Sequence, residues 1–155
     1  MMALLNVENL SVDIGPAQIL KGVNFSMERG ETLGFVGESG CGKSITAMAV
    51  MGLLTEQATV SGRILFDGQD LLALDDAALC KIRGRRIAMI FQEPMTALNP
   101  VKNIGFQIAE GMRLHLGLGR AEAEGRAVAL LDRVGLPAPR FSPDLYPHQL
   151  SGGQR

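Results

Sequence analysis

Apolar and polar residues alternate in two stretches near the start of the chain, whereas two later stretches are apolar almost throughout. Residues 10–14 and 23–27 alternate with the side-chain period of a strand, which predicts two half-buried β-strands. Residues 33–36 and 87–91 are short, nearly continuous apolar runs. Such runs are typical of strands that are covered on both faces, so the pattern predicts two buried strands there.

Apolar residues at intervals of three and four predict helices after residue 44 and in the second half of the chain. Asp75 is placed to cap a short helix, and residues 63–66, followed by the turn pair Asp67-Gly68, are predicted to form a further strand. The four apolar stripes consist of Ile45, Met48, Ala49, Gly52 and Leu53; of Ala78, Leu79 and Ile82; of Ile104, Ile108 and Met112; and of Ala123, Ala127, Leu130, Leu131 and Val134.

The chain changes character after Gln92. Residues 1–92 combine most of the predicted strands with short helices. Residues 93–155 are mainly helical in pattern and begin with the chain-breaking Pro94 and Asn99-Pro100. We therefore expect a mixed α/β region over 1–92 and a helical region over 93–155.

Charge and cysteine content narrow the class of protein. The 155 residues carry a formal net charge of −1, which gives no electrostatic reason to expect nucleic-acid binding. The short basic cluster Arg83, Arg85 and Arg86 is interpreted as a solvated turn. The two cysteines lack the neighbours of a metal site and suit a reducing cytoplasm. The longest apolar run, residues 47–54, is far too short to cross a bilayer, so we expect any membrane contact to be made through partners.

A glycine-rich segment follows the predicted strand 33–36 and reads Gly37-Glu38-Ser39-Gly40-Cys41-Gly42-Lys43-Ser44. It matches the pattern G-x-x-x-x-G-K-[ST], in which glycines let the main chain wrap closely around phosphate oxygens. The helix that follows adds free N–H groups and the positive end of its dipole. Lys43 would bring a positive charge to the β- and γ-phosphates, and Ser44 would offer a hydroxyl to Mg²⁺. The segment therefore predicts a site for ATP and Mg²⁺.

Three segments taken together resemble the ATPases of ABC transporters. Residues 37–44 are similar to the Walker A motif, Gln92 to the Q-loop, and Leu150-Ser151-Gly152-Gly153-Gln154 to the signature motif of that family. Residues 87–100 and 146–153 resemble more narrowly the ATPases of the dipeptide, oligopeptide, nickel and glutathione importers. The resemblance extends over essentially the whole chain.

The resemblance implies a fold and a function. The fold would be α/β, with a P-loop NTPase (RecA-like) core whose sheet is incomplete here, an antiparallel β subdomain and part of an α-helical subdomain. The function would be that of an ATP-binding, ATP-hydrolysing subunit of an importer for peptides or related small solutes. Its partners would be a second ATP-binding subunit, paired head to tail, and transmembrane permease subunits, on which the helical region 93–155 would dock. Its location would be cytoplasmic, on the inner face of the cell membrane.

The same resemblance implies roles for individual residues. Gln92 and Lys43 would take part in catalysis, and Ser44 and Gln92 would contact Mg²⁺. Gln92 would also report the state of the nucleotide to the membrane subunit. The residues expected to bind nucleotide are Ile14, Gly37, Ser39, Gly40, Cys41, Gly42, Lys43, Ser44, Ser151, Gly152, Gly153 and Gln154.

The sequence departs from the family pattern at two places. The family usually has an aromatic residue near position 14 that stacks on adenine, and Ile14 offers no π-stacking. The sequence also ends at Arg155, before the family's Walker B aspartate, its catalytic glutamate and its switch histidine. We therefore expect little hydrolysis and low stability of this chain alone. Two alternatives remain, an ABC ATPase without a transport role and a non-catalytic nucleotide-binding fragment.

Overall fold

The structure, a computed structural model, describes residues 3–93 and 97–155 and consists of two units, Met1–Arg83 and Gly84–Arg155. Pro94, expected to break the chain, lies outside the described residues. The predicted division after Gln92 stays a prediction.

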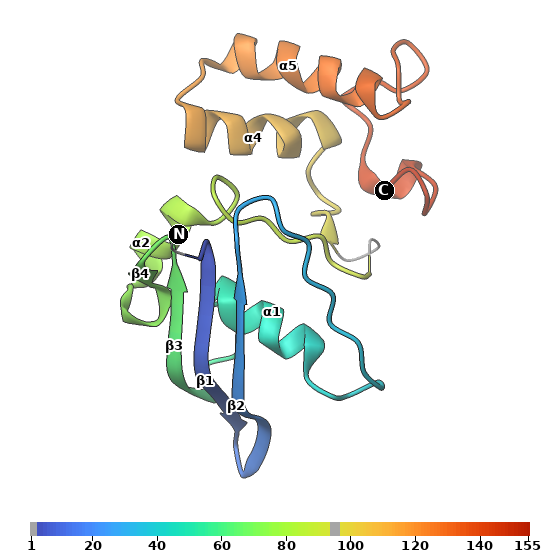
Figure 1. Ribbon diagram of the computed structural model, residues 1–155. Helices are drawn as coiled ribbons and strands as arrows, with labels where there is room; N and C mark the ends of the chain where they lie inside the picture. Colours follow the sequence, from blue (N-terminus) through green and yellow to red (C-terminus); the bar gives the residue numbers. More distant parts are fainter. Residues whose placement is uncertain (1–2, 94–96) are drawn as a thin grey trace. The chain divides into compact units, whose positions relative to one another are not determined.

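An antiparallel sheet forms the centre of the first unit (Figure 1). It contains β1 (Leu5–Ile14), β2 (Ala17–Met27), β3 (Ala58–Phe66) and β4 (Gln69–Asp70) in the order β2-β1-β3-β4. The predicted strands 10–14, 23–27 and 63–66 are confirmed as parts of β1, β2 and β3. Val7, Leu10 and Val12 of β1 lie in the core, where each is at most 1% exposed. Val7 and Leu10, three residues apart, share this face because the strand has a register irregularity between them, with Asn9 at a φ of 51°.

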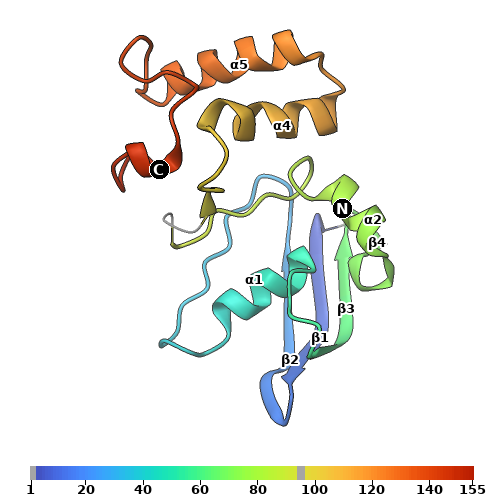
Figure 2. The ribbon, with the colours of Figure 1, turned by 180° about the vertical axis from the view of Figure 1, so that it is seen from behind.

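One helix covers a face of this sheet. Helix α1 (Lys43–Met51) lies behind the strands in Figure 1 and in front of them in Figure 2. A short 3₁₀ turn (Leu71–Ala73) follows β4 and leads to α2 (Asp76–Ile82). Asp75 caps α2 as predicted, because its Oδ1 accepts the Ala78 N–H at 2.8 Å.

Two antiparallel helices, α4 (Ile104–Leu116) and α5 (Arg120–Arg133), form the body of the second unit. Asn103 caps α4 by accepting the Phe106 N–H, and the helix ends at Gly117 in the left-handed conformation. Their contact is made by small residues, Ala109 on α4 with Ala123 and Ala127 on α5. Ala123 and Ala127 belong to a predicted stripe, whereas Ala109 does not.

The proline-rich segment after α5 folds back onto the start of α4. The Ile104 and Gly105 N–H groups, which no residue of α4 can accept, donate to Leu145 O and Pro143 O at 2.8 Å each. A Cβ on Gly105 would lie 2.6 Å from Pro143 Cβ, so this approach requires glycine. A 3₁₀ turn (Pro147–Gln149) then leads to Leu150, which is buried against α4 and α5.

The predicted strands 33–36 and 87–91 are wrong for the structure, which shows neither segment as a strand. A strand needs a hydrogen-bonded neighbour, and the sheet of the described residues contains no strand that pairs with either segment. Some of their apolar side chains are accordingly uncovered, with Val36 100% and Ile90 98% exposed, although Ile87 and Met89 are half-buried and the Phe35 ring packs against Phe25. An apolar run therefore indicates side chains that are suited to burial, but it does not show which neighbouring strand would pair with the segment and bury them.

The mixed α/β character predicted for the chain is confirmed. Among residues 3–93 and 97–155, no helix has both the length and the apolarity that crossing a bilayer requires.

Candidate phosphate-binding site

The loop Gly37–Ser44 leads into the first turn of α1. Gly40 and Gly42 both adopt positive φ, at 86° and 95°, a region that L side chains rarely occupy. Gly42 is also buried against β2, since a Cβ there would lie 2.3 Å from Leu20 Cδ2. Position 42 therefore requires glycine for two reasons: its positive φ, and the lack of space for a Cβ beside Leu20.

The Lys43 ammonium group is held inside the loop. Its Nζ donates to Gly37 O at 2.8 Å and to Glu38 O at 2.7 Å, and lies 3.3 Å from Cys41 Sγ. A thiol sulfur is a weak acceptor, so the third ammonium proton is the one most easily given to a stronger acceptor. The loop thus holds the Lys43 ammonium group in place and leaves one of its N–H donors with only a weak acceptor, the Cys41 sulfur.

The N-terminus of α1 has no side-chain cap among the residues that the structure describes. Gly42 stands at the cap position and provides no side-chain hydrogen bond, and the first turn contains no acidic residue. A helix start normally has such a cap, because its first N–H groups otherwise lack acceptors. The Thr46 hydroxyl is buried and donates to Gly42 O at 3.0 Å, which holds the first turn to the loop.

These features fit a polyphosphate. The uncapped helix start, the positive-φ glycines and the held ammonium group together favour a multivalent anion. Ser44, predicted to offer its hydroxyl to Mg²⁺, is exposed on the first turn of α1, and Ser39, Gly40 and Cys41 are also exposed. The loop residues predicted from the sequence therefore lie together on one segment.

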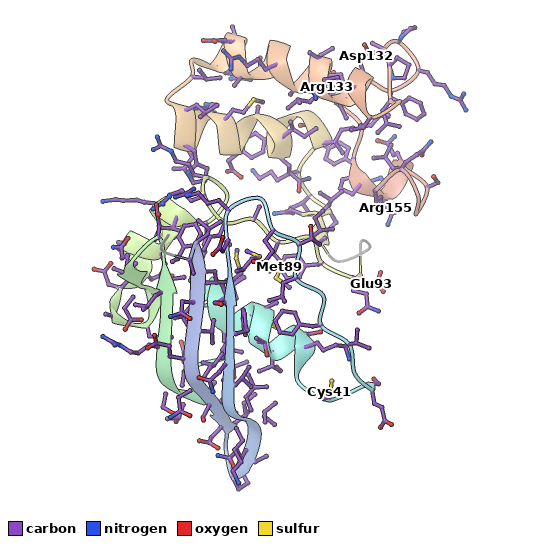
Figure 3. All side chains as sticks on the ribbon, viewed as in Figure 1. Cys41, Met89, Glu93, Asp132, Arg133 and Arg155 are labelled. Atoms are coloured by element: carbon purple, nitrogen blue, oxygen red, sulfur yellow. The ribbon has the colours of Figure 1, made fainter. Side chains whose placement is uncertain are left out.

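Cys41 is an exposed, free cysteine of the loop and is labelled in Figure 3. Its Sγ would lie 2.6 Å from a Cβ built on Gly37, so the thiol crosses the loop. We expect alkylation of Cys41 with N-ethylmaleimide to weaken ATP binding at least roughly tenfold, because the adduct occupies space beside Lys43 Nζ. Titration of the treated and untreated chain with a fluorescent ATP analogue measures the change.

The second cysteine supplies the control for this prediction. Cys80 on α2 is also free and exposed. The variant Cys41→Ser, alkylated at Cys80 only, should keep the ATP affinity of the untreated variant. Equal affinity before and after complete alkylation of Cys41 would show that the thiol lies away from the nucleotide.

The other predicted site residues lie elsewhere in the two units. Ile14 is the last residue of β1, where it is half-buried and pairs with Ala17 and Ala58. Gln92 is exposed and belongs to the second unit. Ile14 lies in the first unit and Gln92 in the second. The roles predicted for them stay predictions.

Residues 151–154 form a turn after the buried Leu150, in which residues 151–153 are exposed and Gln154 is half-buried. Ser151 O accepts the N–H groups of Gln154 and Arg155, both at 3.1 Å, and Gln154 Oε1 accepts the Ser151 N–H at 2.8 Å. Gly152 and Gly153 are exposed, and a Cβ on either would meet no atom within 4 Å. Packing within the chain therefore does not require these two glycines, although a ligand or partner that approaches the backbone would.

The interpretation of the basic cluster as a solvated turn holds for Arg85 and Arg86, which are exposed, but is wrong for Arg83. Arg83, taken as part of a solvated turn, has a side chain only 19% exposed. Its guanidinium donates to Met51 O and Gly52 O at the end of α1. The two partners are 32 and 31 residues away in the sequence, and no local pattern signals such a contact.

Comparison with known proteins agrees with this geometry. A model of the family described as "ABC transporter" matches residues 20–155. The chain is 45% identical to the dipeptide transport ATP-binding protein DppD of Escherichia coli, over 98% of the chain and 48% of the relative. It is 48% identical to a putative peptide import ATP-binding protein of Brucella abortus, over 98% of the chain and 47% of the relative. The chain spans about half the length of the curated relatives it matches.

Solved structures show the same fold. The ATP-binding cassette MJ0796, in a dimeric post-hydrolysis state bound to ADP and Pi, superimposes with a TM-score of 0.81 at 28% identity. The match covers 97% of this chain and 64% of that one. The α/β fold class expected from the sequence is thereby confirmed.

Proposed function

The chain belongs to the ABC transporter family, and from that premise we propose that it is the ATP-binding part of an importer for peptides or related small solutes. The observation that carries the proposal is the loop Gly37–Ser44, which holds the Lys43 ammonium group at an uncapped helix start. Such a site suits the phosphates of ATP, with Mg²⁺ on the Ser44 hydroxyl.

Gln92 and Lys43 are proposed as the residues of this chain that serve hydrolysis. Lys43 would neutralise charge that develops on the transferred phosphate, and Gln92 would contact Mg²⁺ and orient the attacking water. The relatives are about twice as long as this chain, so complete hydrolytic activity is proposed for the whole protein rather than for these residues alone.

The turn at residues 151–154 supports a second cassette as partner. Gly152 and Gly153 leave their backbone open to approach, and the similar cassette MJ0796 is dimeric. We propose that Ser151, Gly152, Gly153 and Gln154 of one copy close over the ATP held by residues 37–44 of the other. Base contact by Ile14 would then rest on an aliphatic side chain without stacking.

Transmembrane permease subunits are the proposed second partner. Two of the relatives carry names for dipeptide and oligopeptide transport, and residues 93–155 are proposed to dock on the permease. The chain would then work in the cytoplasm, on the inner face of the membrane. The solute would be selected by the permease and its associated binding protein.

Affinity purification of the tagged chain from its own cells tests the transport role. We expect membrane permease subunits to be recovered after detergent extraction, and more of them with ATP and Mg²⁺ than without. A tagged variant with Gly153→Arg, which blocks the backbone of the signature turn, serves as the control for nucleotide-dependent assembly. Recovery with ribosomes and without permeases would support an ABC ATPase outside transport and contradict the proposal.

A further inference from the structure

The phosphate helix α1 is short and has little side-chain stabilisation at its ends. It has only nine residues, and isolated helices shorter than about 12 residues are marginal in water. Gly42 provides no capping side chain, the first turn contains no acidic residue, and the last turn contains no basic residue. The missing stabilisation at the N-terminus fits a site for an anion. At the C-terminus, Gly52 adopts the left-handed conformation, and the Gly52 and Leu53 N–H groups donate to Ala49 O and Met48 O. Met51 O and Gly52 O, at the very end of the helix, need another source of hydrogen bonds.

Arg83 supplies that source from a distant part of the chain. Its Nε donates to Met51 O at 2.7 Å, and its Nη2 donates to Gly52 O at 2.7 Å. The last carbonyl groups of a helix have no internal donor and carry the negative end of the dipole. One guanidinium group therefore provides both the hydrogen bonds and the positive charge that the end of α1 lacks.

The guanidinium group is itself fixed in place. Its Nη1 donates to Asp76 Oδ1 at 2.8 Å, on the first turn of α2. Gly52 has a φ of 61°, and a Cβ there would lie 2.8 Å from Leu79 Cδ1 and 2.9 Å from Arg83 Nη2. The ends of α1 and α2 are thus packed closely around the arginine, which limits its alternative positions.

We infer that Arg83 is a positioning residue for the phosphate loop, acting through α1. Because α1 is short, the loss of the Arg83 hydrogen bonds and charge at its C-terminus should loosen the helix as far as its first turn, where Lys43 and Ser44 lie. The residues of the loop would be unchanged in such a variant, but the first turn of α1, which positions the N–H groups, would be less rigid. This inference rests on the proposed function in taking ATP as the ligand.

The experiment compares Arg83→Ala with the unchanged 155-residue chain by amide hydrogen exchange and by ATP titration. We expect the amide of Thr46 in α1, and those of Gly52 and Leu53 directly after it, to exchange about tenfold faster, and ATP affinity to fall about tenfold. The amides of β1 and β3 should exchange at an unchanged rate. Arg83→Lys, which keeps the charge and one donor, should show an intermediate effect on both measurements.

Arg85→Ala is the matched control, because Arg85 lies two residues further on and is exposed. It should change neither measurement. Equal exchange rates of α1 in Arg83→Ala and the unchanged chain would overturn the inference, whether or not ATP binds. Faster exchange throughout the sheet would also overturn it, since that pattern indicates general destabilisation. ATP binding to the unchanged chain tests the proposed function separately.

Discussion

Replacing Lys43 by alanine should reduce ATP affinity by roughly 100- to 1,000-fold, which corresponds to about 3–4 kcal/mol. The ammonium group is the only cation among residues 37–44, and Glu38 is the only anion. Without Lys43 the loop has a net negative charge and repels phosphate. Gly37 O and Glu38 O also lose their donor. Titration with a fluorescent ATP analogue in the presence of Mg²⁺ measures the affinity.

Lys21→Ala is the matched control for this substitution. Lys21 lies on β2 and is exposed. Its replacement by alanine removes the same charge from the same unit. Its ATP affinity should stay within about twofold of that of the unchanged chain, because separated surface charges are screened by salt. If Lys43→Ala bound ATP as tightly as Lys21→Ala does, the loop would not be the nucleotide site and the proposed function would fall with it.

Local chemistry made much of the fold predictable. Alternation identified parts of β1 and β2, residues 63–66 with the turn pair after them identified part of β3, and Asp75 caps α2 as predicted. These features depend on neighbours within a few residues, so the sequence displays them directly. The phosphate loop was predictable for the same reason, because its residues are consecutive.

Features that depend on distant residues were not predictable in this way. The segments 33–36 and 87–91 have strand-like side chains, but a strand also needs a pairing neighbour, which local pattern cannot supply. The position of Arg83 at the end of α1 brings together residues 31 and 32 positions apart. The contact between Leu20 and Gly42 likewise joins a strand to a loop that sequence spacing does not relate.

That last contact predicts a large effect on stability. Gly42→Ala should lower the free energy of unfolding by about 2–5 kcal/mol, of which about 1–2 kcal/mol is backbone strain at positive φ and about 1–3 kcal/mol is overpacking. The strain arises because φ is 95°, and the overpacking because the new Cβ would lie 2.3 Å from Leu20 Cδ2. Urea denaturation followed by circular dichroism measures the change.

Two further variants separate the causes of this loss. Gly40→Ala has a similar φ of 86° but meets no atom within 4 Å, so it should cost only the strain. In a Leu20→Ala background the clash partner is absent, and Gly42→Ala should then cost no more than Gly40→Ala does. An undiminished cost in that background would mean that Leu20 does not confine the loop. If the clash is the cause, the contact of Leu20 on β2 with Gly42 keeps the loop in its conformation. The loop N–H groups proposed to bind phosphate then depend on packing against the sheet for their position.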